Sequence, residues 1–172
     1  MINLGLPRLA VNYARRLAAL SDGDMQQAVN AVNVLYAALH VEEAAELLRD
    51  VGQQRPCEGQ GALVAQLDDV SASFRASHVS VEMCVALMET AVSAIESEGC
   101  SIRYTAPDYH PDHTLGYDLY VDQSASQCAN LSFSVAEALT EKFDDAFPEL
   151  ITFGCRPLTS YVPAGKFIEL AP

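Results

Sequence analysis

Two stretches in which apolar and polar residues alternate, 100–106 and 115–122, constrain this chain more than any other feature. Side chains of a β-strand point to alternate faces, so a period of two is typical of a half-buried strand. Between the two stretches lies an eight-residue segment, Pro107 to Thr114, which we interpret as a loop. The pattern predicts a β-hairpin whose apolar face consists of Cys100, Ile102, Tyr104, Ala106, Leu115, Tyr117, Leu119 and Val121.

Residues 1–52 have a different, helical periodicity. Apolar residues recur every three or four positions from Leu6 to Leu20, again after a capping residue at Ser21, and a third time from Val41 until Gly52. This spacing predicts three amphipathic helices. The segment 53–61, QQRPCEGQG, breaks the period with one Pro and two Gly, so we expect a linker there.

The remainder of the chain predicts alternating strands and helices. Residues 62–76 fit either periodicity, and we favour a strand from Val70 to Ala76. A helix is expected from Ser80 to Gly99, and a second one from a capping box at Ser134 to Pro148, after a polar connection over 124–130. Strands are expected over 151–155 and, after a turn, near the C-terminus between residues 161 and 170.

This order of elements predicts an α+β protein. An N-terminal helical unit (1–52) and a linker (53–61) precede an α+β domain (62–172) with helices on one face of an antiparallel sheet. The succession strand, helix, strand, strand, helix, strand is the ferredoxin-like plan, βαββαβ.

The charge of the chain is strongly negative and unevenly distributed. The net charge is −13; residues 1–55 hold five arginines and six acids, whereas residues 56–172 hold five basic and seventeen acidic residues. Because nucleic-acid binding rests largely on neutralising phosphates, the acidic part is a poor candidate for direct nucleic-acid contact. It is suited instead to a basic surface on another protein.

The compartment and the source are inferred from residue usage. Five cysteines without a C-x-x-C pair favour reduced thiols, and apolar runs of at most six residues are far too short to span a membrane, so we expect a soluble cytoplasmic protein. Two lysines beside eight arginines favour a bacterial or phage origin.

The predicted hairpin loop holds the densest group of reactive side chains in the sequence: Asp108, His110, Asp112 and His113. Imidazole and carboxylate groups are ligands of zinc and similar divalent ions. If a metal is bound, His110, His113 and one of the two aspartates are its expected ligands, and a bound water would permit hydrolysis. The alternative is a solvated loop, in which Asp, His and Pro are ordinary residues.

Established catalytic motifs are absent from the sequence. There is no phosphate-binding G-x-x-x-x-G-K-[ST] or G-x-G-x-x-G loop and no G-x-S-x-G elbow. Cys100 or Cys155 would need a histidine such as His78, His110 or His113 to act as a nucleophile, and the sequence does not specify such a pairing. We therefore expect a protein without enzymatic activity and without a cofactor.

An acidic helix face is the remaining candidate site. It comprises Glu137, Glu141, Asp144 and Asp145, with Glu149 just beyond. Such a row of carboxylates would either be an ordinary solvated face or imitate nucleic-acid phosphates and occupy a basic groove. The sequence thus favours a small acidic inhibitor or adaptor that binds another protein, with a homodimer through the N-terminal helices as a further expectation. The alternative is a metal-dependent hydrolase that uses the 108–113 loop.

Overall fold

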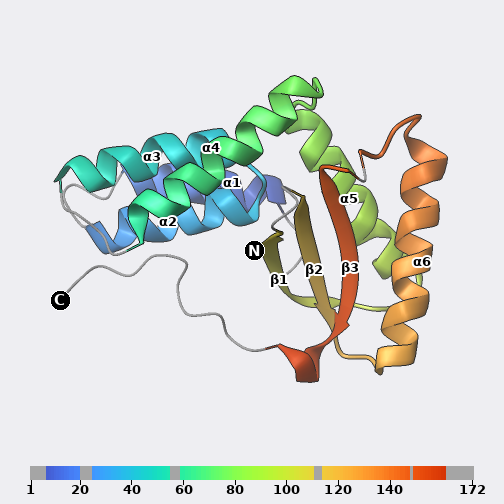
Figure 1. The fold of residues 1–172 in the computed structure, drawn as a ribbon. Helices are drawn as coiled ribbons and strands as arrows, with labels where there is room; N and C mark the ends of the chain where they lie inside the picture. The colour runs from blue at the N-terminus through green and yellow to red at the C-terminus, as the bar shows by residue number, and fades with distance from the viewer. Residues whose placement is uncertain (1–6, 20–24, 55–58, 111–113, 148, 162–172) are drawn as a thin grey trace.

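A helical N-terminal region followed by a small sheet with two flanking helices makes up the fold (Figure 1). The computed structural model describes residues 7–19, 25–54, 59–110, 114–147 and 149–161. The predicted α+β class with an N-terminal helical region is confirmed. In chain order the elements are α1 (Pro7–Ala19), α2 (Met25–Ala37), α3 (Val41–Gln54), α4 (Gln60–Ala76), α5 (Val81–Ser97), β1 (Ile102–Tyr109), β2 (Leu115–Val121), α6 (Ala125–Lys142), β3 (Ile151–Pro157) and the 3-10 helix η2 (Leu158–Ser160).

The predicted hairpin is confirmed, but its loop is shorter than expected. β1 pairs antiparallel with β2 and continues to Tyr109, so Pro107 and Asp108 belong to the strand. The amide of His110 donates to the carbonyl of Thr114 at 2.9 Å, which closes the hairpin. Residues 111–113 lie outside the described part of the chain.

The expected antiparallel sheet is wrong, because β3 runs parallel to β2. Within the described residues the sheet has the order β1-β2-β3, with Leu119 opposite Cys155 in the parallel pair. Parallel neighbours require a crossover connection, and α6 provides it between the end of β2 and the start of β3. The alternation within each strand contains no information on whether neighbouring strands run parallel or antiparallel.

The ferredoxin-like plan is not confirmed, because its first strand is a helix. Residues 70–76 belong to α4, which buries Leu67, Val70 and Phe74 at helical spacing. The alternating pattern that favoured a strand depended on small residues. Ala72 and Ala76 would lie on the apolar face of such a strand, but both are exposed.

Gly52 does not end the third helix as predicted, since α3 continues to Gln54. Its missing side chain serves packing instead. A Cβ at Gly52 would lie 1.5 Å from the side-chain nitrogen of Gln60, and that nitrogen donates to the carbonyl of Leu48 at 3.0 Å. The glycine thus allows the start of α4 to approach α3 closely. The predicted linker over 53–61 is helical at both ends, since 53–54 belong to α3 and 60–61 to α4, and 55–58 lie outside the described residues. The division into two domains stays a prediction.

The start of α6 lies ten residues before the predicted one. The hydroxyl of Ser124 accepts from the amide of Gln127, and the Gln127 side chain accepts from the amide of Ser124, which completes a capping box. The predicted cap, Ser134, lies in the middle of α6, and the expected polar connection over 124–130 is helical. Both serines satisfy the capping pattern, but nothing between them interrupts the helix.

A fully buried tyrosine is one of the residues that connect the sheet to the helical region. Tyr117 in β2 is fully buried, and its hydroxyl donates to the carbonyl of Ala37 at the end of α2. The last carbonyls of a helix have no intrahelical partner, so this bond satisfies one of them. Burial raises the pKa of Tyr117, which keeps its hydroxyl protonated and able to donate.

The opposite face of the sheet carries a cluster of tyrosines. Tyr161, just after η2, stacks on Tyr104 with ring centroids 4.3 Å apart and meets Tyr120 edge to face at 4.9 Å. The rings therefore contact one another. Except for Tyr161, the turn and strand predicted near the C-terminus lie outside the described residues.

Over the ranges that the structure describes, no individual helix has both the length and the apolar composition of a membrane span. The bent pair α4 and α5 passes such a test only when its two helices are joined across a bend of 96°.

The capping of α6 is open to a direct test by a matched pair of variants. Ser124→Ala removes a side-chain cap and is expected to lower the free energy of unfolding by about 1 kcal/mol. Ser134→Ala, at the predicted but unused cap, is expected to change it by less than about 0.5 kcal/mol. Urea unfolding followed by circular dichroism measures both; equal losses, or a larger loss for Ser134→Ala, would contradict the observed helix start.

Candidate functional site

The outward face of α6 contains the acidic residues that the sequence singled out. Burial of Cys128, Leu131, Val135 and Leu139 anchors one stripe of the helix on the protein core. The opposite stripe is turned to solvent. In Figure 1, α6 forms the outer edge of the molecule and its C-terminal end lies beside the start of β3.

The predicted partner-binding residues lie together at that C-terminal end, and all are exposed. Glu137 and Glu141 are one turn apart on the same face of α6, about 6 Å along the helix axis. Asp144 and Asp145 follow the C-cap residue Phe143, and Glu149 lies just before β3. We call these five residues the α6 acidic cluster.

The acidic cluster forms no ion pair with the described residues. Five arginines form ion pairs, but their partners all lie elsewhere: Arg8 with Glu89, Arg15 with Glu43, Arg49 with Asp68, Arg75 with Glu42 and Arg156 with Asp118. Lys142, on α6 itself, donates to the hydroxyl of Thr90 on α5 at 2.9 Å. Among the described residues, no ion pair involves a member of the cluster.

The position of these carboxylates is unfavourable for the helix. The C-terminal end of an α-helix carries the negative end of its macrodipole, so acids in the last turn are repelled and basic residues are preferred there. Glu141 lies in the last turn of α6 and Asp144 immediately follows its cap. Glu137 and Glu141 also repel each other at a spacing of four residues. Helix stability therefore does not explain why acids occupy these positions.

Asp145 differs from the other members because it has a structural role. One of its carboxylate oxygens accepts a hydrogen bond from the amide of Phe147 at 2.8 Å. This bond fixes the turn between α6 and β3, where Phe147 has a left-handed φ of 50°. Changes at Asp145 would disturb the turn, so it is a poor position for testing charge alone.

A large exposed aromatic residue, Phe133, lies beside the acidic cluster. Its exposed fraction is 74%, the highest among the large hydrophobic residues of the described ranges. Because residues four apart share a helix face, Phe133 neighbours Glu137. The sequence reasoning missed it, since Phe133 fell before the predicted start of the helix. An exposed aromatic next to uncompensated charge is a combination typical of binding surfaces.

The predicted metal loop is only partly described. Asp108 is exposed in β1, and His110 follows the strand with its ring against Gly116, where a Cβ would lie 2.6 Å from the ring nitrogen Nε2. Asp112 and His113 lie outside the described residues. The part of the chain that is described contains no group of three His, Cys, Asp or Glu residues placed to hold a metal ion. Metal binding by this loop stays a prediction.

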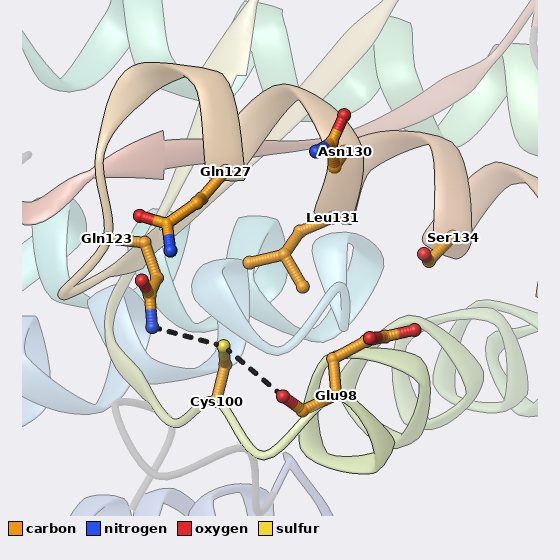
Figure 2. Close-up of a pocket in the computed structure, with 7 residues that line it drawn as sticks. All are labelled: Glu98, Cys100, Gln123, Gln127, Asn130, Leu131 and Ser134. Atoms are coloured by element: carbon orange, nitrogen blue, oxygen red, sulfur yellow. Dashed lines mark hydrogen bonds between the residues drawn. The ribbon is translucent and has the colours of Figure 1, made fainter.

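A polar pocket of about 250 Å³ lies at the N-terminal half of α6, where the helix meets the end of α5 (Figure 2). Cys100 lies at its base: the thiol accepts from the side-chain amide of Gln123 at 3.3 Å and donates to the carbonyl of Glu98 at 3.8 Å. Gln127 and Asn130 line the α6 side. In Figure 2 the Glu98 carboxylate is directed away from the thiol.

The cysteines do not form a nucleophilic site with the described histidines. No hydrogen bond joins a thiol to an imidazole there: Cys100 and Cys155 lie toward one end of the sheet, and His110 lies at the hairpin end opposite. Burial raises the pKa of Cys155 to about 11 and that of Cys84 to about 12. Both therefore remain thiols at neutral pH, the unreactive form.

Comparison of the chain with protein-family models, with curated proteins and with solved structures found no match. The function must therefore be argued from the site itself.

The unfavourable placement of the acids predicts that their removal stabilises the protein. Glu141→Gln and Asp144→Asn are each expected to raise the free energy of unfolding by about 0.3–1 kcal/mol, because each removes a negative charge from the negative end of α6. Glu46→Gln, in the middle of α3 and near Arg49, serves as the control and is expected to give no gain. Urea unfolding at low salt measures all three, and a loss of stability at residues 141 and 144 would contradict this interpretation.

Proposed function

We propose that this chain is a small acidic binding protein, an inhibitor or adaptor without enzymatic activity of its own. It acts in the cytoplasm and uses the α6 acidic cluster to contact a basic surface on another protein. One observation carries the proposal: carboxylates accumulate, without ion pairs among the described residues, at the helix end where the helix dipole disfavours them. Residues kept at positions that disfavour folding are typical of functional surfaces.

The composition of the surface suits a partner that is both basic and partly apolar. Phe133 provides an aromatic group that loses its contact with water on binding, and aromatic side chains often dominate binding energies. Glu137 and Glu141 provide charge next to it, which accelerates encounter with a basic partner and disfavours an acidic one. The described arginines that form ion pairs have partners outside the acidic cluster. Lys and Arg side chains on the partner protein would therefore form ion pairs with these carboxylates.

Imitation of nucleic acid is the more specific form of the proposal. Carboxylates on successive turns of α6 give a rigid row of negative charge, as phosphates do along a strand. A partner whose basic groove normally holds nucleic acid would then bind either α6 or its natural ligand. Competition between the two for one groove distinguishes this form from an ordinary acidic contact.

The N-terminal helices offer a second surface, which supports the expected homodimer or an additional docking contact. Leu9 and Tyr13, one turn apart on α1, have exposed fractions of 53% and 51%. Exposed apolar residues that share a helix face are typical of helix-to-helix contacts between chains. The hydrolase alternative has no comparable support, because Asp112 and His113 of its loop lie outside the described residues.

Capture of partners from the native cytoplasm, followed by binding measurements with charge variants, tests the proposal. Glu137→Gln with Glu141→Gln is expected to raise the dissociation constant of the captured partner at least tenfold at 50 mM salt. The matched control is Glu46→Gln with Asp50→Asn, which removes two exposed carboxylates at the same spacing from α3. The control is expected to change affinity less than twofold, and the wild-type affinity is expected to fall with added salt.

Equal affinity of the 137/141 variant and the wild-type protein would contradict the proposal. The imitation of nucleic acid has its own criterion: added duplex DNA or RNA must displace the chain from its partner. If the partner binds the chain and the nucleic acid at the same time, the contact is acidic but does not imitate phosphates.

A further inference from the structure

A groove of about 380 Å³ runs between the second half of α6 and the first residues of β3. Its walls are mostly apolar, and they include Leu139 and Phe143 on one side and Ile151 and Phe153 on the other. The groove has the size of a site for a few side chains rather than that of a packing defect. In Figure 1 the connection that follows α6 leads from the end of this helix to the start of β3, the two elements that contribute to the groove.

The floor of the groove includes part of an open strand edge. Backbone groups of a strand point alternately to its two sides. The amide of Leu115 donates to the carbonyl of Leu150 at 2.8 Å, so the even-numbered residues of β3 face β2. The amide of Ile151 instead donates to the carbonyl of Phe147, and that of Cys155 donates to the hydroxyl of Ser132 on α6.

Phe153 lies between these two residues, so its backbone N–H and C=O also face away from β2. Neighbours outside the sheet satisfy the amides on either side of it, but we find none at Phe153 among the described residues. An exposed strand edge is a template for pairing with another extended segment. The two free groups of Phe153 can exchange a pair of hydrogen bonds with one residue of such a segment.

The charge of the groove indicates which kind of extended segment it can bind. Asp144 and Asp145 are among its lining residues, and none of the described residues that line it is basic. Phe133 is close to the α6 wall, three residues from Ala136 and seven from Thr140, which both line the groove. An apolar lining that also includes carboxylates fits an apolar side chain with a basic residue beside it.

We infer that this groove binds an extended segment of the partner that carries a Lys or Arg next to an apolar residue. The segment adds to the edge of β3 through the backbone of Phe153, places its apolar side chain between Phe143 and Ile151, and its basic side chain meets Asp144. This inference rests on the proposed function and deepens it, because it specifies which kind of partner segment the acidic surface receives.

Addition of a strand accounts for the unpaired backbone groups of Phe153, whereas docking of a helix does not. Backbone hydrogen bonds supply affinity in this mode, and pockets for alternate side chains supply specificity. A helix has satisfied its own backbone groups, so it would leave the N–H and C=O of Phe153 without partners.

A displayed library of random twelve-residue peptides, selected on the full chain, tests the inference. Selected peptides are expected to share an apolar residue next to Lys or Arg. Thr140→Arg, which places a long cationic side chain on the groove wall, is expected to weaken their binding at least tenfold. The hydroxyl of Thr140 bonds only to carbonyls of its own helix, and Arg is a good helix former, so the fold is expected to persist.

Asn130→Arg is the matched control, because it adds the same charge on an exposed position of α6 outside the groove. It is expected to change peptide affinity less than twofold. N-methylation of a selected peptide at successive residues gives a second readout: pairing with Phe153 predicts loss of binding at the one residue whose amide donates to the carbonyl of Phe153. Failure to enrich peptides, equal effects of the two Arg variants, or binding that tolerates N-methylation at every single position would each overturn the inference.

The two proposals fail separately. If the natural partner loses affinity on neutralisation of Glu137 and Glu141 but not on Thr140→Arg, the groove is not used and the acidic contact stands. If Thr140→Arg abolishes partner binding while the 137/141 variant has no effect, the groove stands and the acidic contact is wrong.

Discussion

The parallel pairing of β2 with β3 is the constraint on which the rest of the candidate site depends. A parallel neighbour cannot be reached through a hairpin, so the chain must return along the sheet, and α6 is that return. Its 18 residues span about 27 Å, close to the roughly 23 Å of a seven-residue strand. The C-terminal end of α6 must therefore lie near the start of β3, which brings the acidic cluster and the groove together.

Among the described residues, a side-chain hydrogen bond joins α6 to β3 within this crossover. Ser132 on α6 accepts from the amide of Cys155 at 2.9 Å, so the helix covers one part of the outer edge of β3. The part that it does not cover is at Phe153, beside the groove. The crossover helix thus covers one part of the outer edge of β3 and leaves the part at Phe153 accessible. That accessible part lies next to carboxylates that have no ion-pair partner among the described residues.

The ends of a helix could be predicted from the sequence where the residues at those ends favour only one local structure. α5 begins after Ser80, which caps it, and ends at Ser97, shortly before Gly99, whose φ of 73° is one that glycine adopts readily. Two other helices end in the same left-handed way at Leu39 and His78, with φ of 63° and 58°. These residues carry no such signal, so their helix ends could not be predicted in the same way.

The candidate site divides along similar lines. The acidic cluster was predictable because its residues are close in the sequence and share one helix face. The groove was not, because it depends on residues 136–146 lying against 151–153, and that requires the direction of β3. Phe133 was missed because Ser134 with Glu137 satisfies the capping pattern as well as Ser124 with Gln127 does, and only the continuous helix distinguishes them.

The central claim is that the C-terminal half of α6 and the adjacent edge of β3 form the surface that a partner covers. Amide hydrogen exchange of the chain, alone and in complex with its captured partner, tests it most directly. The account predicts that binding slows exchange in 136–147 and at Phe153, with little change in α3. Slowed exchange confined to the N-terminal helices, with residues 136–153 unchanged, would contradict it.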